Sequence, residues 1–364
     1  MSIVQKRKKT RQINIGSVKI GNGAPVAVQS MTNTYTQDVT STVSQINQLS
    51  KAGCEIIRIA IPDMDAALAV KKIKKQIDIP LIADIHFDYK LAIAAAENGA
   101  DALRINPGNI GAKSRVEKLV QCAKNNGISI RIGVNSGSLE KDIEKEFGNG
   151  AKAMAKSAEQ NIDLLRSMDF HDLKISVKAS DVSRTVEAYR LVSSMTDLPL
   201  HLGVTEAGGL YAGISKSAIG IGMLLAEGIG DTMRVSLTRD PVEEIRTAWE
   251  ILRALDIRKR GVEIISCPTC GRCRIDLFDI AEKVEKSLLN IKVPVKIAIM
   301  GCVVNGPGEA KDADIGIAGG DGIGILFKKG KLVKKIPQDK LIDVLLEEVE
   351  KYTKTWRKLN GEKG

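Results

Sequence analysis

Eight short apolar segments recur between residues 25 and 240, and they constrain the fold more than any other feature of the sequence. Each segment is rich in β-branched residues and continuously apolar, which is typical of strands buried on both faces of a parallel sheet. The segments are PVAVQSMT (25–32), EIIRIAI (55–61), PLIADIHF (80–87), ALRINPG (102–108), SIRIGVN (129–135), LKISVKAS (173–180), LHLGVTEAG (200–208) and TMRVSLT (232–238). Stretches with helical spacing separate them, and the helix starts include Asp65, Asp181 and the pair Asp240-Pro241.

This alternation of strand and helix predicts a (β/α)8 barrel of the TIM type. A doubly wound open sheet is the alternative, but it would need fewer strands or a glycine-rich turn after the first strand. The sequence after the first apolar segment, SMTNTYTQD, is no such turn. We therefore expect an α/β barrel over residues 1–260 and a small α+β domain over residues 261–364.

Each apolar segment ends in polar residues, and these ends carry the candidate site. The C-terminal strand ends of a barrel converge on its active site. Five of the polar residues are basic: Arg58, Arg104, Arg131, Lys178 and Arg234. One such residue could pair with a carboxylate at the rim, but five buried cations repel one another unless an anion is present. Guanidinium groups match phosphate oxygens, so we expect a phosphate or diphosphate ligand. Further contacts are expected from Asn106, Asn135, Thr205 and Ser236.

The same strand ends supply the candidate acids and bases. Asp84 and His86 end the third segment in ADIHF, and Glu206 ends the seventh in GVTEAG. A histidine at this face can bind a ligand or transfer a proton near neutral pH. His171 and His201 lie near strand starts, so we expect them to be structural.

The character of the chain changes after the eighth helix. Residues 262–273 read VEIISCPTCGRC, and a strand expected at 295–301 leads directly to Cys302 in GCVVNGPGEA. The Cys267-x2-Cys270 pair can bind one metal centre, and Cys302 adds a third thiolate. A structural zinc site on Cys267, Cys270, Cys273 and Cys302 is the alternative at this point. Cys54 and Cys122 are expected to be buried apolar residues in barrel helices.

Composition excludes some classes of function. No stretch approaches the roughly 20 apolar residues that span a bilayer, and the N-terminus lacks the apolar core of a signal peptide. We therefore expect a cytoplasmic protein, where cysteines are more often metal ligands or thiols than disulfides. The net charge of +10 lies partly in basic runs at 6–11 and 328–335, which we expect to be solvated. Aromatic residues make up only 3%, which argues against a nucleic-acid stacking platform.

Together these motifs resemble the 4-hydroxy-3-methylbut-2-enyl diphosphate synthase family over nearly the whole chain. The matching segments are VQSMTNT, ADIHF, RINPGNIG, IRIGVNSGSL, SVKAS, GVTEAG, RVSLT, CPTCGRC and GCVVNGPGEA, and the last two are very specific. The resemblance implies an iron–sulfur oxidoreductase of isoprenoid biosynthesis. Such an enzyme opens the ring of 2-C-methyl-D-erythritol 2,4-cyclodiphosphate, removes a hydroxyl as water and adds two electrons one at a time.

The resemblance also implies a ligand set and partners. A 4Fe–4S cluster would be held by Cys267, Cys270, Cys302 and Glu309, with Cys273 as an additional cysteine. A carboxylate ligand is displaced more easily than a thiolate, so the iron that it binds can accept a substrate oxygen. Glu206 would then protonate the departing hydroxyl. Flavodoxin or ferredoxin would donate the electrons, and a homodimer would close one subunit's cluster domain over the other's barrel.

One function from a different enzyme class stays open from the residues alone. A redox-silent phosphosugar aldolase or isomerase with a zinc-stabilised tail would also use barrel cations and a Cys-x2-Cys pair.

Overall fold

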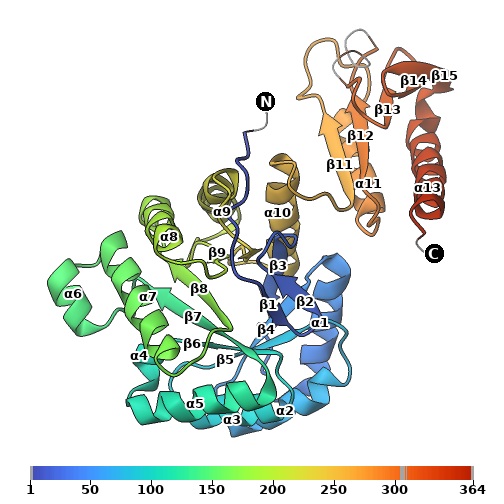
Figure 1. Ribbon diagram of the computed structural model, residues 1–364. Coiled ribbons are helices and arrows are strands. Elements are labelled where there is room, and N and C mark those ends of the chain that lie inside the picture. The colour runs from blue at the N-terminus through green and yellow to red at the C-terminus, as the bar shows by residue number, and fades with distance from the viewer. Residues whose placement is uncertain (1–2, 304–307, 309, 362–364) are drawn as a thin grey trace. The chain divides into compact units, whose positions relative to one another are not determined.

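All eight predicted strands are present in the computed structural model, which describes residues 3–303, 308 and 310–361 (Figure 1). They are β3 Ala27–Met31, β4 Ile56–Ala60, β5 Leu81–Asp84, β6 Ala102–Ile105, β7 Ser129–Asn135, β8 Leu173–Lys178, β9 His201–Leu202 and β10 Thr232–Met233. The strands are parallel, in the order β8-β7-β6-β5-β4-β3-β10-β9. A parallel bridge between Ile175 and Leu200 joins β8 to the start of β9, so the sheet closes into the predicted barrel.

A helix follows every strand, and most of these helices begin at an aspartate cap. The eight are α1 Val39–Ala52, α2 Met64–Lys74, α3 Tyr89–Glu97, α5 Lys113–Asn126, α7 Ala151–Arg166, α8 Val182–Met195, α9 Leu210–Ala226 and α10 Pro241–Ala254. Two short helices, α4 Pro107–Ile110 and α6 Lys141–Phe147, lie in the connections that follow β6 and β7. Asp181 and Asp240 cap α8 and α10 as predicted, whereas α2 is capped by Asp63 rather than Asp65. An aspartate side chain at this position accepts a backbone N–H that the helix leaves unpaired.

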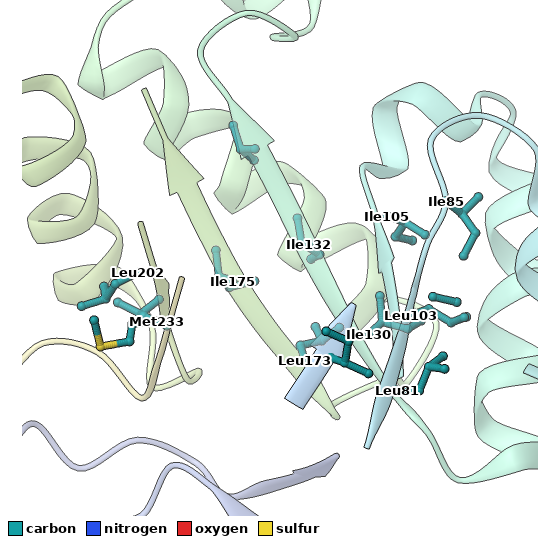
Figure 2. Packing of buried hydrophobic residues seen from close by; sticks show 14 of the residues in the cluster. Leu81, Ile85, Leu103, Ile105, Ile130, Ile132, Leu173, Ile175, Leu202 and Met233 are labelled. Atoms are coloured by element: carbon teal, nitrogen blue, oxygen red, sulfur yellow. The ribbon is translucent and has the colours of Figure 1, made fainter. Parts of the chain in front are cut away.

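Strand alternation decides which side chains line the barrel. The residues that face the helices are apolar, and Figure 2 shows several of them, from Leu81 on β5 to Met233 on β10. Because strand side chains alternate between faces, the residues between them point into the barrel. On β7 and β8 these inward residues are Ser129, Arg131, Gly133, Asn135, Lys174, Ser176 and Lys178. On β7 and β8 the barrel interior is therefore polar, whereas the layer that faces the helices is apolar.

The N-terminal segment contains a hairpin that the sequence did not reveal. Strands β1 Ile13–Ile15 and β2 Val18–Ile20 pair antiparallel. Their isoleucines pack on the first inward residues of β3 to β6, so the hairpin covers the N-terminal end of the barrel.

We had expected the basic run before this hairpin to be solvated. Two of its residues instead form hydrogen bonds within the protein. Arg7 donates to Ala24 O at 2.5 Å and to Asp231 Oδ1 at 2.9 Å, and Lys8 donates to Thr196 O at 2.8 Å. The expectation was wrong for these two residues because carbonyl groups at the base of the barrel need donors.

The chain divides into two compact units, Met1–Arg258 and Lys259–Gly364. The second contains a five-stranded sheet of β11 Val262–Ser266, β12 Val295–Met300, β13 Ile315–Ala318, β14 Ile323–Lys328 and β15 Lys331–Pro337. The first three strands are parallel and the last two pair antiparallel. Helices α11 Leu277–Leu288 and α13 Leu341–Leu359, the latter after the 3-10 turn Gln338–Lys340, pack on the sheet through an apolar core of this unit's own. This is the small α+β domain that the sequence predicts. Within the described ranges, no helix has the length and apolarity needed to cross a membrane.

Candidate active site

The five predicted cations lie together at the barrel interior. Arg58, Arg104, Arg131 and Lys178 are buried on β4, β6, β7 and β8, and half-buried Arg234 follows β10. Each occupies an inward position of its strand, so the fold points all five toward the barrel axis. Burial, helped by the charges of Arg234 and Arg104 and opposed in part by Asp84, lowers the pKa of Arg58 to about 10. The site therefore concentrates positive charge where water is scarce.

Two buried carboxylates offset part of this charge. Asp84 Oδ2 lies 3.5 Å from Arg58 Nε, and Asp84 Oδ1 accepts a hydrogen bond from Arg104 Nη1 at 3.1 Å. Burial alone would raise the pKa of Asp84, but Arg58, the nearby His86 and Arg104 hold it well below its usual range. Asp84 is therefore an ionised counter-ion. A carboxyl group held in this state is poorly suited to donate a proton.

The second carboxylate, Glu244, was missed by our sequence reasoning. It lies in the first turn of α10, is only 4% exposed, and reaches Arg234 Nη2 at 3.5 Å. A side chain on a helix is not normally expected to pair with a side chain at the end of a strand. One signal was available, because Glu244 falls on the apolar face of α10 that also carries Ile245, Ala248 and Leu252.

Arg131 and Lys178 have no carboxylate partner in the part of the chain that the structure describes. Arg131 Nε and Nη1 are buried without a hydrogen-bond acceptor. Burial, followed by the charge of neighbouring arginines, lowers the pKa of both groups well below the usual values. Buried donors normally have partners, so these two residues mark where an anionic ligand would be bound most strongly.

Two glycines make room for the cations. A Cβ atom at Gly133 of β7 would lie 2.6 Å from Arg104 Nε, and one at Gly203 after β9 would lie 2.5 Å from Lys178 Nζ. Side chains at these positions would push the cations out of place. The glycines in IRIGVN and HLGVTEAG are thus explained by the side chains that lie over them.

The amide residues of the strand ends support this arrangement. Asn106 caps α4 through Gly108 N at 3.2 Å, and its Nδ2 donates to Ser138 O at 3.4 Å. Asn135 ends β7, and in the amide orientation that satisfies its hydrogen bonds it accepts from Arg104 Nη2 at 3.3 Å. Thr205 and Ser236 lie half-buried in the loops after β9 and β10.

The two remaining acid–base candidates lie nearer to solvent. The His86 side chain is 55% exposed, and its Nε2 lies 3.7 Å from Asp84 Oδ2 and 3.4 Å from Arg104 Nη1. Glu206 is exposed and has a positive φ of 50°, which is unusual for a residue with a side chain. Its carboxylate forms no ion pair with any other described residue, so the alternative of a salt bridge to a rim arginine finds no support.

Lys174 is a further inward cation that we did not predict as a site residue. It is 1% exposed, lies beside Arg131 in the strand register, and its Nζ has no hydrogen-bond partner among the described residues. The signal was its two-residue spacing from Ser176 and its four-residue spacing from Lys178 along LKISVKAS, which places all three on one face.

The other histidines and cysteines of the barrel have surroundings that suit structural roles. His201 is fully buried and its Nδ1 lies 2.8 Å from Thr232 Oγ1, whereas His171 is exposed beside Asp169. Cys54 follows α1 rather than lying in it, and burial raises the pKa of its thiol to about 12. Cys122 is half-buried in α5.

The cysteines of the second unit gather at one edge of its sheet. Cys267 directly follows β11, and Cys302 follows β12 after Gly301, so both lie at the C-terminal ends of adjacent parallel strands. Gly301 N donates to Cys267 Sγ at 3.3 Å. A Cβ atom at Gly301 would lie 2.6 Å from Cys273 Sγ and 3.4 Å from Cys267 Sγ. Three of the four cysteines therefore lie around one glycine.

The chemistry of these donors suits a metal centre with thiolate ligands. All four are free thiols, and a backbone hydrogen bond from Arg272 lowers the pKa of exposed Cys270. N–H groups directed at sulfur stabilise the thiolate form that binds iron. Among the described residues, no three His, Cys, Asp or Glu side chains are already arranged around a metal position. Glu309, the expected fourth ligand, lies outside the described residues.

Comparison with known proteins matches both units. Residues 10–249 match the model of the GcpE TIM-barrel domain, and residues 263–351 match that of the GcpE protein C-terminal domain. A protein of Desulfotalea psychrophila is 56% identical over 356 residues, covering 97% of this chain and 98% of that protein. A protein of Caldanaerobacter subterraneus subsp. tengcongensis is 58% identical over 353 residues, covering 97% and 99%. Both are named 4-hydroxy-3-methylbut-2-en-1-yl diphosphate synthase (flavodoxin). With both units matched in order and relatives this similar along nearly the entire length, the chain belongs to the GcpE family.

Proposed function

We propose that this protein is an iron–sulfur oxidoreductase that converts 2-C-methyl-D-erythritol 2,4-cyclodiphosphate to 4-hydroxy-3-methylbut-2-enyl diphosphate. The observation that carries the proposal is the charge of the barrel interior in a chain of this family, where the five predicted cations and Lys174 pair, among the described residues, with the two carboxylates Asp84 and Glu244 alone. Membership of the GcpE family does not support the alternative of a phosphosugar aldolase or isomerase with a zinc tail.

The barrel cations bind the diphosphate and stabilise it as the ring opens. A cyclic diphosphate carries about two negative charges, and cleavage of its carbon–oxygen bond adds about one more on the departing phosphate oxygen. The excess of cations over carboxylates therefore suits the opened form better than the closed one, which is the condition for accelerating the step. Arg131 and Lys178 take the largest part of this role because no carboxylate in the described part of the chain pairs with them. Asn106, Asn135, Thr205 and Ser236 orient the ligand from neighbouring strand ends.

Glu206 supplies the proton that turns the departing hydroxyl into water. Hydroxide is a poor leaving group, so a positioned acid is needed. The left-handed backbone at Glu206 supports this role, since strained backbone is retained where surrounding structure and function require it. Asp84 is better suited to hold Arg58 and Arg104. His86, which shares the Asp84 carboxylate, is the next candidate acid.

Cys267, Cys270, Cys302 and Glu309 would hold a 4Fe–4S cluster, which supplies two electrons one at a time when it is bound. The hydrogen bond from Gly301 to Cys267 supports the assignment. We assign the electron donor as flavodoxin, because the relatives carry that word in their names, with ferredoxin as the other candidate. We also propose a homodimer in which each cluster domain serves its partner's barrel.

The experiment that tests the function uses protein purified without oxygen and reduced by dithionite. Phosphorus nuclear magnetic resonance should show the cyclic diphosphate disappear and a linear diphosphate form. The solution should be brown, with absorbance near roughly 400 nm that dithionite bleaches, because iron–sulfur charge transfer is visible and zinc is colourless. A protein with an intact, reducible cluster that leaves the cyclic diphosphate unchanged would refute the proposal. A colourless protein with one bound zinc would revive the alternative.

A further inference from the structure

Glu244, on α10, contacts two other elements, the strand β3 and the loop after β10. Its Oε1 accepts a hydrogen bond from Leu237 N at 3.0 Å, and its Oε2 accepts one from Ser30 Oγ at 3.3 Å. Both oxygens lie 3.5 Å from Arg234 Nη2. The carboxylate is buried near the N-terminus of α10, where the helix dipole favours negative charge. Glu244 thus links a helix, a strand and the loop after β10 to one guanidinium group.

Glu244 holds Arg234 through one nitrogen, Nη2, and no other carboxylate among the described residues pairs with the guanidinium. Arg234 Nε is buried without a hydrogen-bond acceptor in the described part of the chain, and Nη1 lies 3.9 Å from Met31 Sδ. Met31 Sδ also accepts from Arg58 Nε at 3.2 Å and from Arg58 Nη2 at 3.0 Å. A thioether is a weak, uncharged acceptor, so it can lie between two guanidinium groups without neutralising either.

A carboxylate beside an anion site repels the ligand, so its presence there calls for a reason. Arginine binds phosphate well only when its planar group has the correct orientation. A side chain with four rotatable bonds loses conformational freedom on binding unless it is already held in place. Glu244 can supply that restraint at the cost of some electrostatic attraction.

We infer that Glu244 is a positioning residue for Arg234 in the diphosphate site, with Met31 as the uncharged acceptor on the opposite side. The inference rests on the proposed function, because it assumes that the barrel binds a diphosphate. Glu244 itself does not touch the ligand. Its effect on binding must therefore pass through Arg234.

A double-mutant cycle on the intact holoenzyme tests this, with inorganic pyrophosphate as the probe and calorimetry as the readout. Glu244→Gln keeps one amide oxygen to accept from Leu237 N and an NH2 group that can donate to Ser30 Oγ, but it loses the charge that holds Arg234. The single variant should bind pyrophosphate about fivefold more weakly than wild type. In an Arg234→Met background the same change should alter affinity by less than about twofold. Glu243→Gln is the matched control, because Glu243 is the preceding residue and pairs with Arg246 at the surface.

Each outcome decides the inference. An equal loss of affinity in both backgrounds would mean that Glu244 only stabilises the fold, and unchanged or tighter binding in Glu244→Gln would also overturn the inference. If Glu244→Gln melts at a much lower temperature than Glu243→Gln, the variant Glu244→Asp is used in the cycle instead. The shorter aspartate keeps the negative charge but moves it away from Arg234. Turnover of the cyclic diphosphate by wild type reports separately on the proposed function. If pyrophosphate binding follows the expected double-mutant cycle but the wild type does not turn over the cyclic diphosphate, the proposed function is refuted and the inference about Glu244 still holds.

Discussion

The barrel interior and the cysteine edge of the second unit are prepared to different degrees. In the barrel, Asp84, Glu244 and the clearance at Gly133 hold cations in place although the cations repel one another. At the cysteine edge, Cys270 is exposed, and Cys267 and Cys273 lie around Gly301 without, among the described residues, a charged partner of the kind that fixes the barrel cations. A charge site can be built by rigid strands before its ligand arrives, whereas a thiolate centre is assembled by the metal that it binds. Mutations should therefore act differently in the two places.

The largest effect is expected at the cysteine edge. Cys267→Ser, Cys270→Ser and Cys302→Ser should each lose the cluster and all turnover, because the metal itself brings these ligands together. Cys273→Ser should keep most of both, although Cys273 Sγ lies beside Gly301 like Cys267 Sγ. Iron content and visible absorbance after anaerobic reconstitution measure the loss. Loss of the cluster in Cys273→Ser, together with a normal spectrum in Glu309→Ala, would replace the proposed ligand set by four cysteines.

The next effect separates chemistry from assembly. Glu206→Gln should retain a spectroscopically normal cluster and bind substrate, yet turn over at least about a hundredfold more slowly because the proton donor is gone. Glu309→Gln should instead alter the spectrum of the resting cluster. Single-turnover kinetics with the pre-reduced enzyme gives the rate. Near-normal turnover in Glu206→Gln would make His86 the preferred acid.

Within the barrel, the unpaired cations should matter more than the paired ones. Arg131→Met and Lys178→Met should raise KM for the cyclic diphosphate about a hundredfold, since no carboxylate of the described residues pairs with either side chain. Arg58→Met and Arg104→Met should raise it about tenfold, because Asp84 already offsets part of the charge that each of them offers to the ligand. Saturation curves at constant ionic strength provide the comparison. Equal KM values for all four variants would mean that pairing with Asp84 does not determine how much each cation contributes to binding.

Much of this arrangement could be predicted from the sequence, and the failures have physical reasons. The strands were found because each apolar run ends in polar residues, and the cations because five of the eight runs carry a basic residue at a position that faces inward. Glu244 was missed because its partner Arg234 belongs to another element, and a buried acidic residue on an apolar helix face looks like an interruption of the pattern. The hairpin β1–β2 was missed because its strands have three residues each, too short for a clear alternation. Lys174 was missed because it lies at the start of its strand, whereas an active site is expected at the strand ends.

A smaller effect concerns the stability that Asp84 gives to the barrel. Asp84→Asn should lower the thermal stability of the ligand-free protein at pH 7, because it leaves two buried guanidinium groups without their counter-ion, a loss of about 3 kcal/mol. The pKa of Asp84 is lowered in the folded protein, so its stabilisation is complete above the ordinary carboxyl pKa near about 4 and falls as the pH drops below that value. Melting curves at pH 7 and in mild acid should show the difference between the two proteins shrink only below about pH 4. A difference that already shrinks between about pH 6 and 7 would mean that another group controls it.

The smallest effect should come from Met31, the uncharged contact between Arg58 and Arg234. Met31→Leu keeps nearly the same volume and removes only the sulfur acceptor, so we expect KM to rise about twofold with kcat and melting temperature unchanged. Met31→Glu tests the same position in the opposite sense. A carboxylate there would pair with both guanidinium groups and compete with the diphosphate, and KM should rise more than about tenfold while the empty protein becomes harder to melt. If both variants bind the diphosphate like wild type, the thioether does not lie between the two arginines when ligand is bound, and the ring of cations must rearrange on binding.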